Sequence, residues 1–175
     1  GYTEFDDKAA SHKYREQDGR TALISRTASM ISGKGMILTN SAGNTGAAEW
    51  KRIGFPGDAH DVLTVGALAP DSTNTTFSSV GPTYDGRVKP DVMAMGGYCT
   101  VINGKGLVAH ANGTSFSTPI TCGLVACLWQ ALPNKTASEI MQLVRESADR
   151  ADYPDNIFGY GIPDFWKAYQ MGLNK

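Results

Sequence analysis

Residues 62–68 have the sequence VLTVGAL, a run in which only Thr64 and Gly66 are not hydrophobic. Two shorter apolar runs lie on either side of it in the chain, residues 36–39 (MILT) and 91–95 (DVMAM). Continuous apolar runs, unlike alternating ones, are typical of strands that are covered on both faces, as in the parallel sheets of α/β proteins. The three runs therefore predict a mostly parallel sheet flanked by helices.

Two amphipathic helices and a short final one are expected around this sheet. Residues 20–32 place apolar side chains on one side of a helix, with Asp18 positioned to cap its start. Thr136 and Glu139 have the spacing of a capping box and open a second amphipathic helix. A last helix is expected over residues 164–171.

Residues 115–132 contain no charged side chain, which raises the question of a membrane span. Polar residues such as Ser117 and Gln130 interrupt the stretch, and no basic residues flank it. A helix that is apolar on all sides is better explained as the buried centre of a domain. We accordingly expect Cys122 and Cys127, five residues apart on this helix, to be buried small hydrophobic side chains.

A β-hairpin is expected directly before this helix. Residues 99–102 and 106–109 have the pattern of strands and flank Asn103-Gly104, a strong hairpin signal. The chain has no internal repeat and no low-complexity linker. It is interpreted as one α/β domain with helices gathered towards its C-terminal end.

The composition excludes some classes of partner. Sixteen basic and seventeen acidic residues leave a net charge of -1, without the basic excess that binding to nucleic acid or to an anionic membrane requires. The three cysteines, Cys99, Cys122 and Cys127, have no CxxC spacing, so no metal site is indicated. No cofactor is indicated either.

The segment that carries chemistry is residues 112–119, NGTSFSTP. A strand runs through a glycine turn into a helix, and Ser115 lies in the first helical turn. The N–H groups of that turn have no acceptor within the helix and, with the helix dipole, favour an anion. A serine there is able to attack a carbonyl while its own N–H holds the oxyanion. The alternative is a simple N-cap serine. The nucleophile elbow of α/β-hydrolases does not match, because Ser117 stands where that motif has glycine.

A second polar segment, residues 41–46 (SAGNTG), follows the first predicted strand. Ligands of open α/β sheets bind beyond the carboxyl ends of the strands. Asn44 on this glycine-rich loop could direct its amide at the same anion. The alternative is a turn asparagine that bonds its own backbone.

Together the two segments resemble the subtilisin-like serine peptidases, whose nucleophile motif is Gly-Thr-Ser-x-x-x-Pro and whose oxyanion motif is Ala-Gly-Asn-x-Gly. The likeness covers nearly the whole chain. Four further segments look like family segments in the family's order: residues 65–67, 77–82, 89–92 and 160–162.

The resemblance implies a partial subtilisin-like fold in which a hairpin leads into a buried central helix, followed by two C-terminal helices. It implies that Ser115 is the nucleophile and Asn44 the oxyanion donor. One wall of the pocket for the residue before the scissile bond would come from Thr39, Asn40, Ser41, Ala42 and Gly43. It further implies peptide or protein substrates and a secreted or cell-envelope location. Calcium is frequent in the family, but no acidic cluster for it is evident here.

The chain departs from the family pattern in one respect. The family's aspartate lies in Asp-Thr/Ser-Gly and its histidine in His-Gly-Thr, and neither motif occurs here. His110 lies five residues before Ser115, on the hairpin strand, where the resemblance does not place the catalytic base. His60 and Asp61 are chain neighbours, which tend to point apart. We therefore expect residues 1–175 to be the C-terminal portion of a peptidase domain, with the other triad members upstream of Gly1.

Two consequences follow for function, and two alternatives stay open. The chain alone is expected to be essentially inactive, because a serine without its base is a poor nucleophile. Removing the N-terminal half should expose a strand edge and one side of the Ser115 helix, so the chain is expected to dock to that half or to self-associate. The alternatives are a non-catalytic subtilisin-like binding scaffold and, less favoured, a serine hydrolase with His110 as its base.

Overall fold

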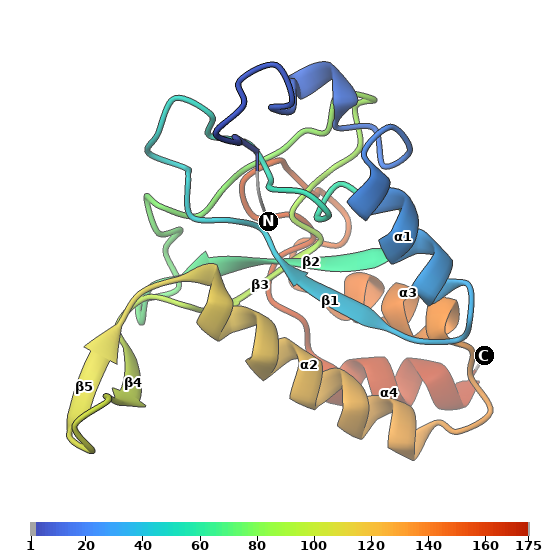
Figure 1. The fold of residues 1–175 in the computed structure, drawn as a ribbon. Coiled ribbons are helices and arrows are strands. Elements are labelled where there is room, and N and C mark those ends of the chain that lie inside the picture. The colour runs from blue at the N-terminus through green and yellow to red at the C-terminus, as the bar shows by residue number, and fades with distance from the viewer. Residues whose placement is uncertain (1–2, 175) are drawn as a thin grey trace.

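The computed structural model describes residues 3–174, within which a parallel sheet, a β-hairpin and four α-helices are formed (Figure 1). In chain order the elements are the 3-10 helix η1 (Tyr14–Glu16), α1 (Leu23–Ser32), β1 (Leu38–Ser41), β2 (Val62–Leu68), β3 (Val92–Met95), β4 (Cys99–Ile102), β5 (Val108–Ala111), α2 (Thr114–Ala131), α3 (Ala137–Ser147) and α4 (Phe165–Asn174).

The sheet has the strand order β1-β2-β3, and both neighbouring pairs are parallel. Leu38 at the start of β1 pairs with Val62, and Val65 of β2 pairs with Val92 of β3. Every residue of β2 is buried, as a central strand covered on both faces requires. The predicted α/β class with a mostly parallel sheet is confirmed.

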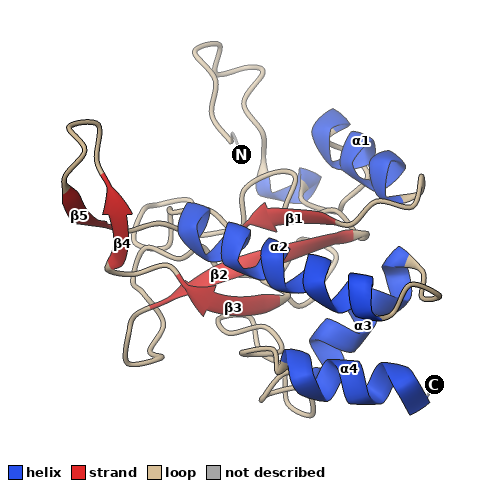
Figure 2. Cartoon of the chain, turned by 90° about the horizontal axis from the view of Figure 1, so that it is seen from below, coloured by secondary structure: helices blue, strands red, loops and turns tan. Residues whose placement is uncertain are grey.

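Helices cover both faces of this sheet. Side chains alternate between the faces of a strand, so Leu63 and Val65 share one face, where they join the main hydrophobic core with Val125 of α2. Val62 faces the opposite way and packs in a second cluster with Ala28 of α1. Figure 2 shows α2 lying over one face of the sheet, with α1 on the other side of β1.

The two C-terminal helices complete the main core. Ile140 and Val144 of α3 and Ala168 of α4 are fully buried in it. The predicted capping box of α3 is confirmed: the backbone N–H of Glu139 donates to the Thr136 hydroxyl at 3.3 Å, and the Glu139 carboxylate accepts from the Thr136 N–H at 2.8 Å.

A buried charge cluster joins α3 to the sheet. Lys89 Nζ donates to Asp91 Oδ2 at 2.6 Å, and Arg145 Nε of α3 donates to Asp91 Oδ1 at 2.8 Å. Lys89 Nζ also donates to the carbonyl of Val62 and to the hydroxyl of Thr64. Burial alone would raise the pKa of Asp91, but the two cations outweigh it and hold the pKa of Asp91 below its usual range.

The predicted hairpin is present, with Thr100 of β4 opposite His110 of β5. It projects away from the rest of the molecule (Figure 1). From β5 the chain turns into α2 at Gly113, whose N–H donates to the carbonyl of Gly96 at 2.8 Å. This bond anchors the turn that presents Ser115.

Some element boundaries differ from the sequence prediction. The first strand begins at Leu38, two residues later than expected, and extends through Ser41. The first helix begins at Leu23, because Asp18 accepts bonds from the N–H groups of Arg20 and Thr21 and so closes a separate turn ahead of it.

The apolar pattern predicted that α2 is buried on all sides, which is wrong for this chain, whereas the resemblance predicted one exposed side, which is present. The expectation that Cys122 and Cys127 are buried is wrong. Both cysteines are exposed, as are Ile120 and Leu124 on the same helix. The sheet and the C-terminal helices cover one face of α2, and no described residue covers the other. An apolar sequence predicts that a helix will be covered, but it does not specify which part of the protein covers it.

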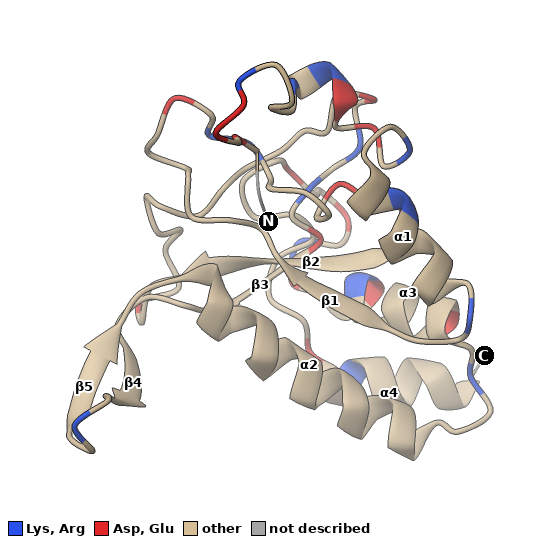
Figure 3. Ribbon diagram, viewed as in Figure 1, with Lys and Arg blue, Asp and Glu red and all other residues tan. Residues whose placement is uncertain are grey.

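Charged side chains are concentrated in the loops of the N-terminal region and at the outer ends of the helices, whereas α2 carries none (Figure 3). Among residues 3–174, no helix combines the length and the apolar character needed to cross a bilayer.

Candidate active site

Ser115 lies at the second position of α2, next to the glycine turn, and its side chain is exposed. An N–H at this position has no acceptor within the helix, so it is available to an anion. The positive end of the dipole of this long helix points the same way. The residue before it, Thr114, is by contrast almost completely buried.

Asn44 lies on the loop that leaves the carboxyl end of β1, and its side-chain oxygen is held by Thr114. Asn44 Oδ1 accepts from the Thr114 backbone N–H at 2.9 Å and from the Thr114 hydroxyl at 2.9 Å. A backbone N–H is always a donor, so this bond fixes the orientation of the amide: oxygen towards Thr114 and Nδ2 away from it.

The free Nδ2 of Asn44 lies against the turn in front of Ser115. A β-carbon placed on Gly113 would be 3.4 Å from it. The donor NH₂ group of Asn44 therefore lies beside the turn that leads into α2. The structure brings together the two segments that the sequence analysis singled out, although they are 70 residues apart.

The rest of the 39–43 segment supports this arrangement. The N–H of Gly43 donates to the Thr114 hydroxyl at 3.3 Å, and Ala42 is fully buried, with its N–H bonded to the carbonyl of Val65. Thr39, Asn40 and Ser41 belong to β1 and are half-buried. Their role as a pocket wall remains a prediction.

Comparison with known proteins identifies the family. A sequence model described as "Subtilase family" matches residues 6–161. The chain belongs to the subtilase family. It is 33% identical over 149 residues to the serine protease AprX of Bacillus subtilis, covering 73% of this chain and 34% of AprX. It is 28% identical over 131 residues to subtilisin DY of Bacillus licheniformis, covering 74% of this chain and 45% of that protein.

A solved structure shows the same fold. The self-cleaved protease domain of PatA superposes with a TM-score of 0.69 at 24% identity, covering 85% of this chain and 54% of that domain. This subtilase chain thus spans about half of that domain and between a third and a half of the two bacterial relatives.

The three histidines of this subtilase chain are engaged elsewhere. His12 Nδ1 bonds Glu16 at 2.9 Å, and the His12 ring packs on Phe55. His60 Nε2 lies 3.3 Å from the carbonyl of Asp18. The ring of His110, on the outer hairpin, stacks on Tyr98 at 3.9 Å. No histidine is bonded to Ser115 in the described part of the chain.

The described residues hold no cluster of side chains typical of a metal site. Between residues 3 and 174, no three His, Cys, Asp or Glu side chains come together in a group that could hold a metal ion. Asp6 and Asp7 are exposed loop residues.

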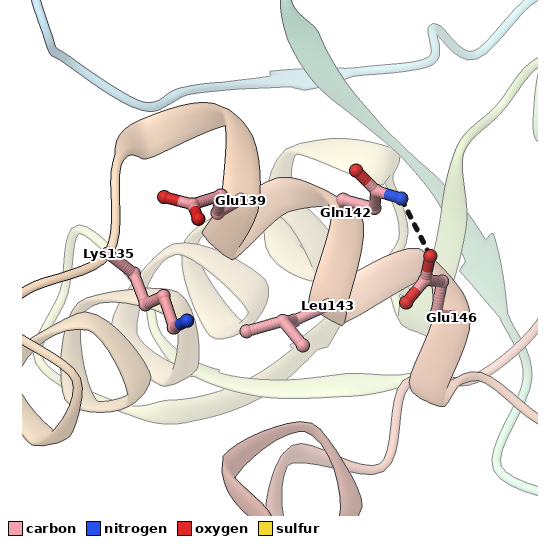
Figure 4. Close-up of a pocket in the computed structure, with 5 residues that line it drawn as sticks. All are labelled: Lys135, Glu139, Gln142, Leu143 and Glu146. Carbon is pink, nitrogen blue, oxygen red and sulfur yellow. Dashed lines mark hydrogen bonds between the residues drawn. The ribbon is translucent and has the colours of Figure 1, made fainter. Parts of the chain in front are cut away.

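A pocket of about 190 Å³ lies along α3, far from these segments in the sequence (Figure 4). Its lining comes from α3 and the turn before it, and Gln142 donates to Glu146 at its rim. None of its residues belongs to the 39–46 or 113–115 segments, so it has no part in the candidate site.

Two contributors to the site escaped the sequence analysis. Thr114 was part of the nucleophile motif but received no role of its own. Ser79 lies in the 77–82 segment, noted only as a family likeness, yet it bonds the Asn44 loop directly. Both residues lie in motifs that the sequence analysis quoted, and these motifs were the signal for them. A sequence motif does not show, however, which side chain forms a hydrogen bond with which loop.

Proposed function

We propose that residues 1–175 are the C-terminal half of a subtilisin-type serine endopeptidase domain, with Ser115 as nucleophile and Asn44 as oxyanion donor. The observation that carries the proposal is the pair of bonds from Thr114 to Asn44 Oδ1. They hold the amide oxygen on Thr114, which leaves the Asn44 NH₂ group available as a donor. A binding scaffold has no need of that orientation.

In the proposed reaction, Ser115 Oγ attacks the carbonyl carbon of a peptide bond and its proton passes to a base. The negative charge that develops on the carbonyl oxygen is held by Asn44 Nδ2 and the Ser115 N–H. The tetrahedral intermediate collapses when the leaving amine takes the proton from the base, which leaves an ester on Ser115. Water then hydrolyses the ester by the same steps in reverse order.

The base and its aspartate would come from the half of the domain upstream of Gly1. Without them the chain is expected to be essentially inactive. In subtilisin itself, a member of this family, loss of the triad is known to cost on the order of 10⁶ in kcat, while the oxyanion hole retains some catalysis.

The upstream half is also the proposed partner of the uncovered surface. Ile120 and Leu124 of α2 are 44% and 43% exposed, and β1 is an edge strand. On α1, Leu23 and Met30 are 70% and 69% exposed. These exposed apolar side chains on α1 and α2, together with the open edge strand β1, form the apolar front of this chain. Such a surface is expected where the rest of the same domain packs against it.

The test compares two proteins, the full-length gene product and the isolated 1–175 chain. We expect the full-length protein to cleave peptides and to react with a fluorophosphonate probe at Ser115, located by mass spectrometry. The isolated chain and a full-length Ser115→Ala variant should do neither. A full-length protein that is inert to the probe would support the non-catalytic scaffold instead. Labelling of the isolated chain at Ser115 would show that a base lies within residues 1–175.

Oligomeric state tests the proposed partner. Light scattering should show the isolated chain as an aggregate or an oligomer, because its apolar front lacks its cover. A monodisperse monomer would contradict the proposal.

A further inference from the structure

The hydroxyl of Ser79 is fully buried and bonds the loop that carries Asn44. Ser79 Oγ accepts from the backbone N–H of Thr45 at 3.1 Å, and it lies 3.0 Å from the Thr45 hydroxyl. Thr45 is the residue directly after Asn44. The Thr45 hydroxyl is in turn 3.4 Å from the carbonyl of Arg52, so the contact continues into the next loop.

The backbone of Ser79 holds the residue on the other side of Asn44. Its N–H donates to the carbonyl of Gly43 at 2.9 Å. One residue thus bonds both chain neighbours of Asn44. No other described contact of the loop has this two-sided form.

The fit between Ser79 and Gly43 leaves no space for a side chain. Gly43 has a φ of 112°, and a β-carbon on it would lie 2.8 Å from Ser79 Oγ. The loop backbone therefore lies directly on the hydroxyl. Because the contact is this close, a small displacement of the Ser79 hydroxyl would also displace the backbone next to Asn44.

We propose that Ser79 is a positioning residue for Asn44: it sets the loop backbone, while Thr114 sets the orientation of the amide. The inference rests on the proposed oxyanion role of Asn44. An oxyanion donor acts only if it is already at hydrogen-bond distance from the oxygen of the transition state, so its support affects catalysis directly.

Adjacent Ser78 provides a matched control. It is equally buried, and its hydroxyl likewise accepts one backbone N–H, at 3.1 Å, but from Ala67 of β2 rather than from the loop. Ser78→Ala and Ser79→Ala therefore remove the same chemical group from the same depth. Only Ser79→Ala removes a side-chain contact with a neighbour of Asn44, namely Thr45, while the backbone bond to Gly43 remains.

The experiment measures kcat and KM of the full-length protein on a peptide substrate. Ser79→Ala is expected to lower kcat about 10-fold with KM little changed, because substrate binding does not use the oxyanion donor. Ser78→Ala should stay within about 2-fold. In an Asn44→Ala background, Ser79→Ala should lose its effect, since the group that it positions is gone.

The results distinguish a failure of the proposed oxyanion role of Asn44 from a failure of the proposed positioning role of Ser79. If Asn44→Ala itself leaves kcat unchanged, the proposed function fails. If Asn44→Ala lowers kcat but Ser79→Ala lowers it equally in both backgrounds, or no more than Ser78→Ala does, the positioning role alone fails.

A second variant covers the case in which Ser79→Ala does not fold. Thr45→Val removes the hydroxyl that contacts Ser79 and keeps the shape of the side chain. We expect a kcat about 3-fold lower, and no further loss in the Asn44→Ala background. Equal losses in the two backgrounds would overturn the proposal.

Discussion

The side-chain oxygen of Asn44 accepts two hydrogen bonds from Thr114, both of 2.9 Å, across a sequence separation of 70 residues. One donor is a backbone N–H at the start of α2 and the other is a hydroxyl that also accepts from Gly43. The loop after β1 and the turn before α2 are thereby fastened together. The residue that fastens them directly precedes Ser115.

Thr114→Val tests the hydroxyl half of this link in the full-length protein. The substitution keeps the size of the side chain and removes one of the two bonds to Asn44. We expect kcat to fall about 10-fold with little change in KM, as partial loss of an oxyanion donor predicts; loss of the whole donor costs about 10²–10³ in subtilisin, a known value for this family. Thr114→Ser keeps the hydroxyl and should stay within about 3-fold. Equal kinetics of the two variants would contradict the role of the hydroxyl.

Asp91→Asn tests the buried charge cluster. It leaves Lys89 buried without its counter-ion, so the free energy of unfolding should fall by about 3–5 kcal/mol. Asp152→Asn alters an exposed carboxylate and should change it by less than about 0.5 kcal/mol. Urea denaturation of the full-length protein provides both values, and a similar effect of the two substitutions would argue against the cluster.

The difference in unfolding free energy between wild type and Asp91→Asn should depend on pH in a defined direction. The pKa of Asp91 is held below its ordinary value, so its ionised form stabilises the folded protein. This stability is present above the unfolded pKa of about 3.9 and is lost as the pH falls through the lower, folded value. The deficit of Asp91→Asn relative to wild type should therefore be complete at pH 6 and shrink below pH about 4. A stability difference between the two proteins that becomes larger as the pH falls below about 4 would contradict this prediction.

Cysteine modification tests whether another part of the protein covers α2. Cys122 and Cys127 are exposed in this chain, whereas Cys99 is buried and burial raises the pKa of its thiol. N-ethylmaleimide should modify the first two quickly in isolated 1–175 at high dilution, where self-association is weakest, and at least about 10-fold more slowly in the full-length protein. Cys99 reports on unfolding, since it reacts only if the fold opens. Equal rates for Cys122 and Cys127 in both proteins would show that α2 is not covered by the upstream half.

The sequence predicted much of the fold because its signals are local. The run 62–68 became β2 without a change of boundary, and the Thr136–Glu139 capping box opened α3. Local patterns gave wrong predictions where burial depends on packing against distant parts of the protein. The family resemblance predicted that one side of the apolar helix 115–132 would be exposed, but the apolar pattern did not show which side, so Cys122 and Cys127 were wrongly expected to be buried.

The candidate site divides in the same way. Glycine-rich motifs indicated Asn44 and Ser115, because a motif marks the residues that a site needs. They did not indicate which bonds orient them. The contacts of Thr114 and Ser79 with the Asn44 loop join segments that are distant in the sequence, and only the folded chain reveals them.

A crystal structure of the full-length protein with a peptide boronic acid tests most directly whether Asn44 and Ser115 hold the same oxyanion. The boron should be bonded to Ser115 Oγ, with one boronate oxygen about 2.7–3.1 Å from both Asn44 Nδ2 and the Ser115 N–H. An adduct on another residue, or a boronate oxygen that Asn44 does not contact, would contradict the account.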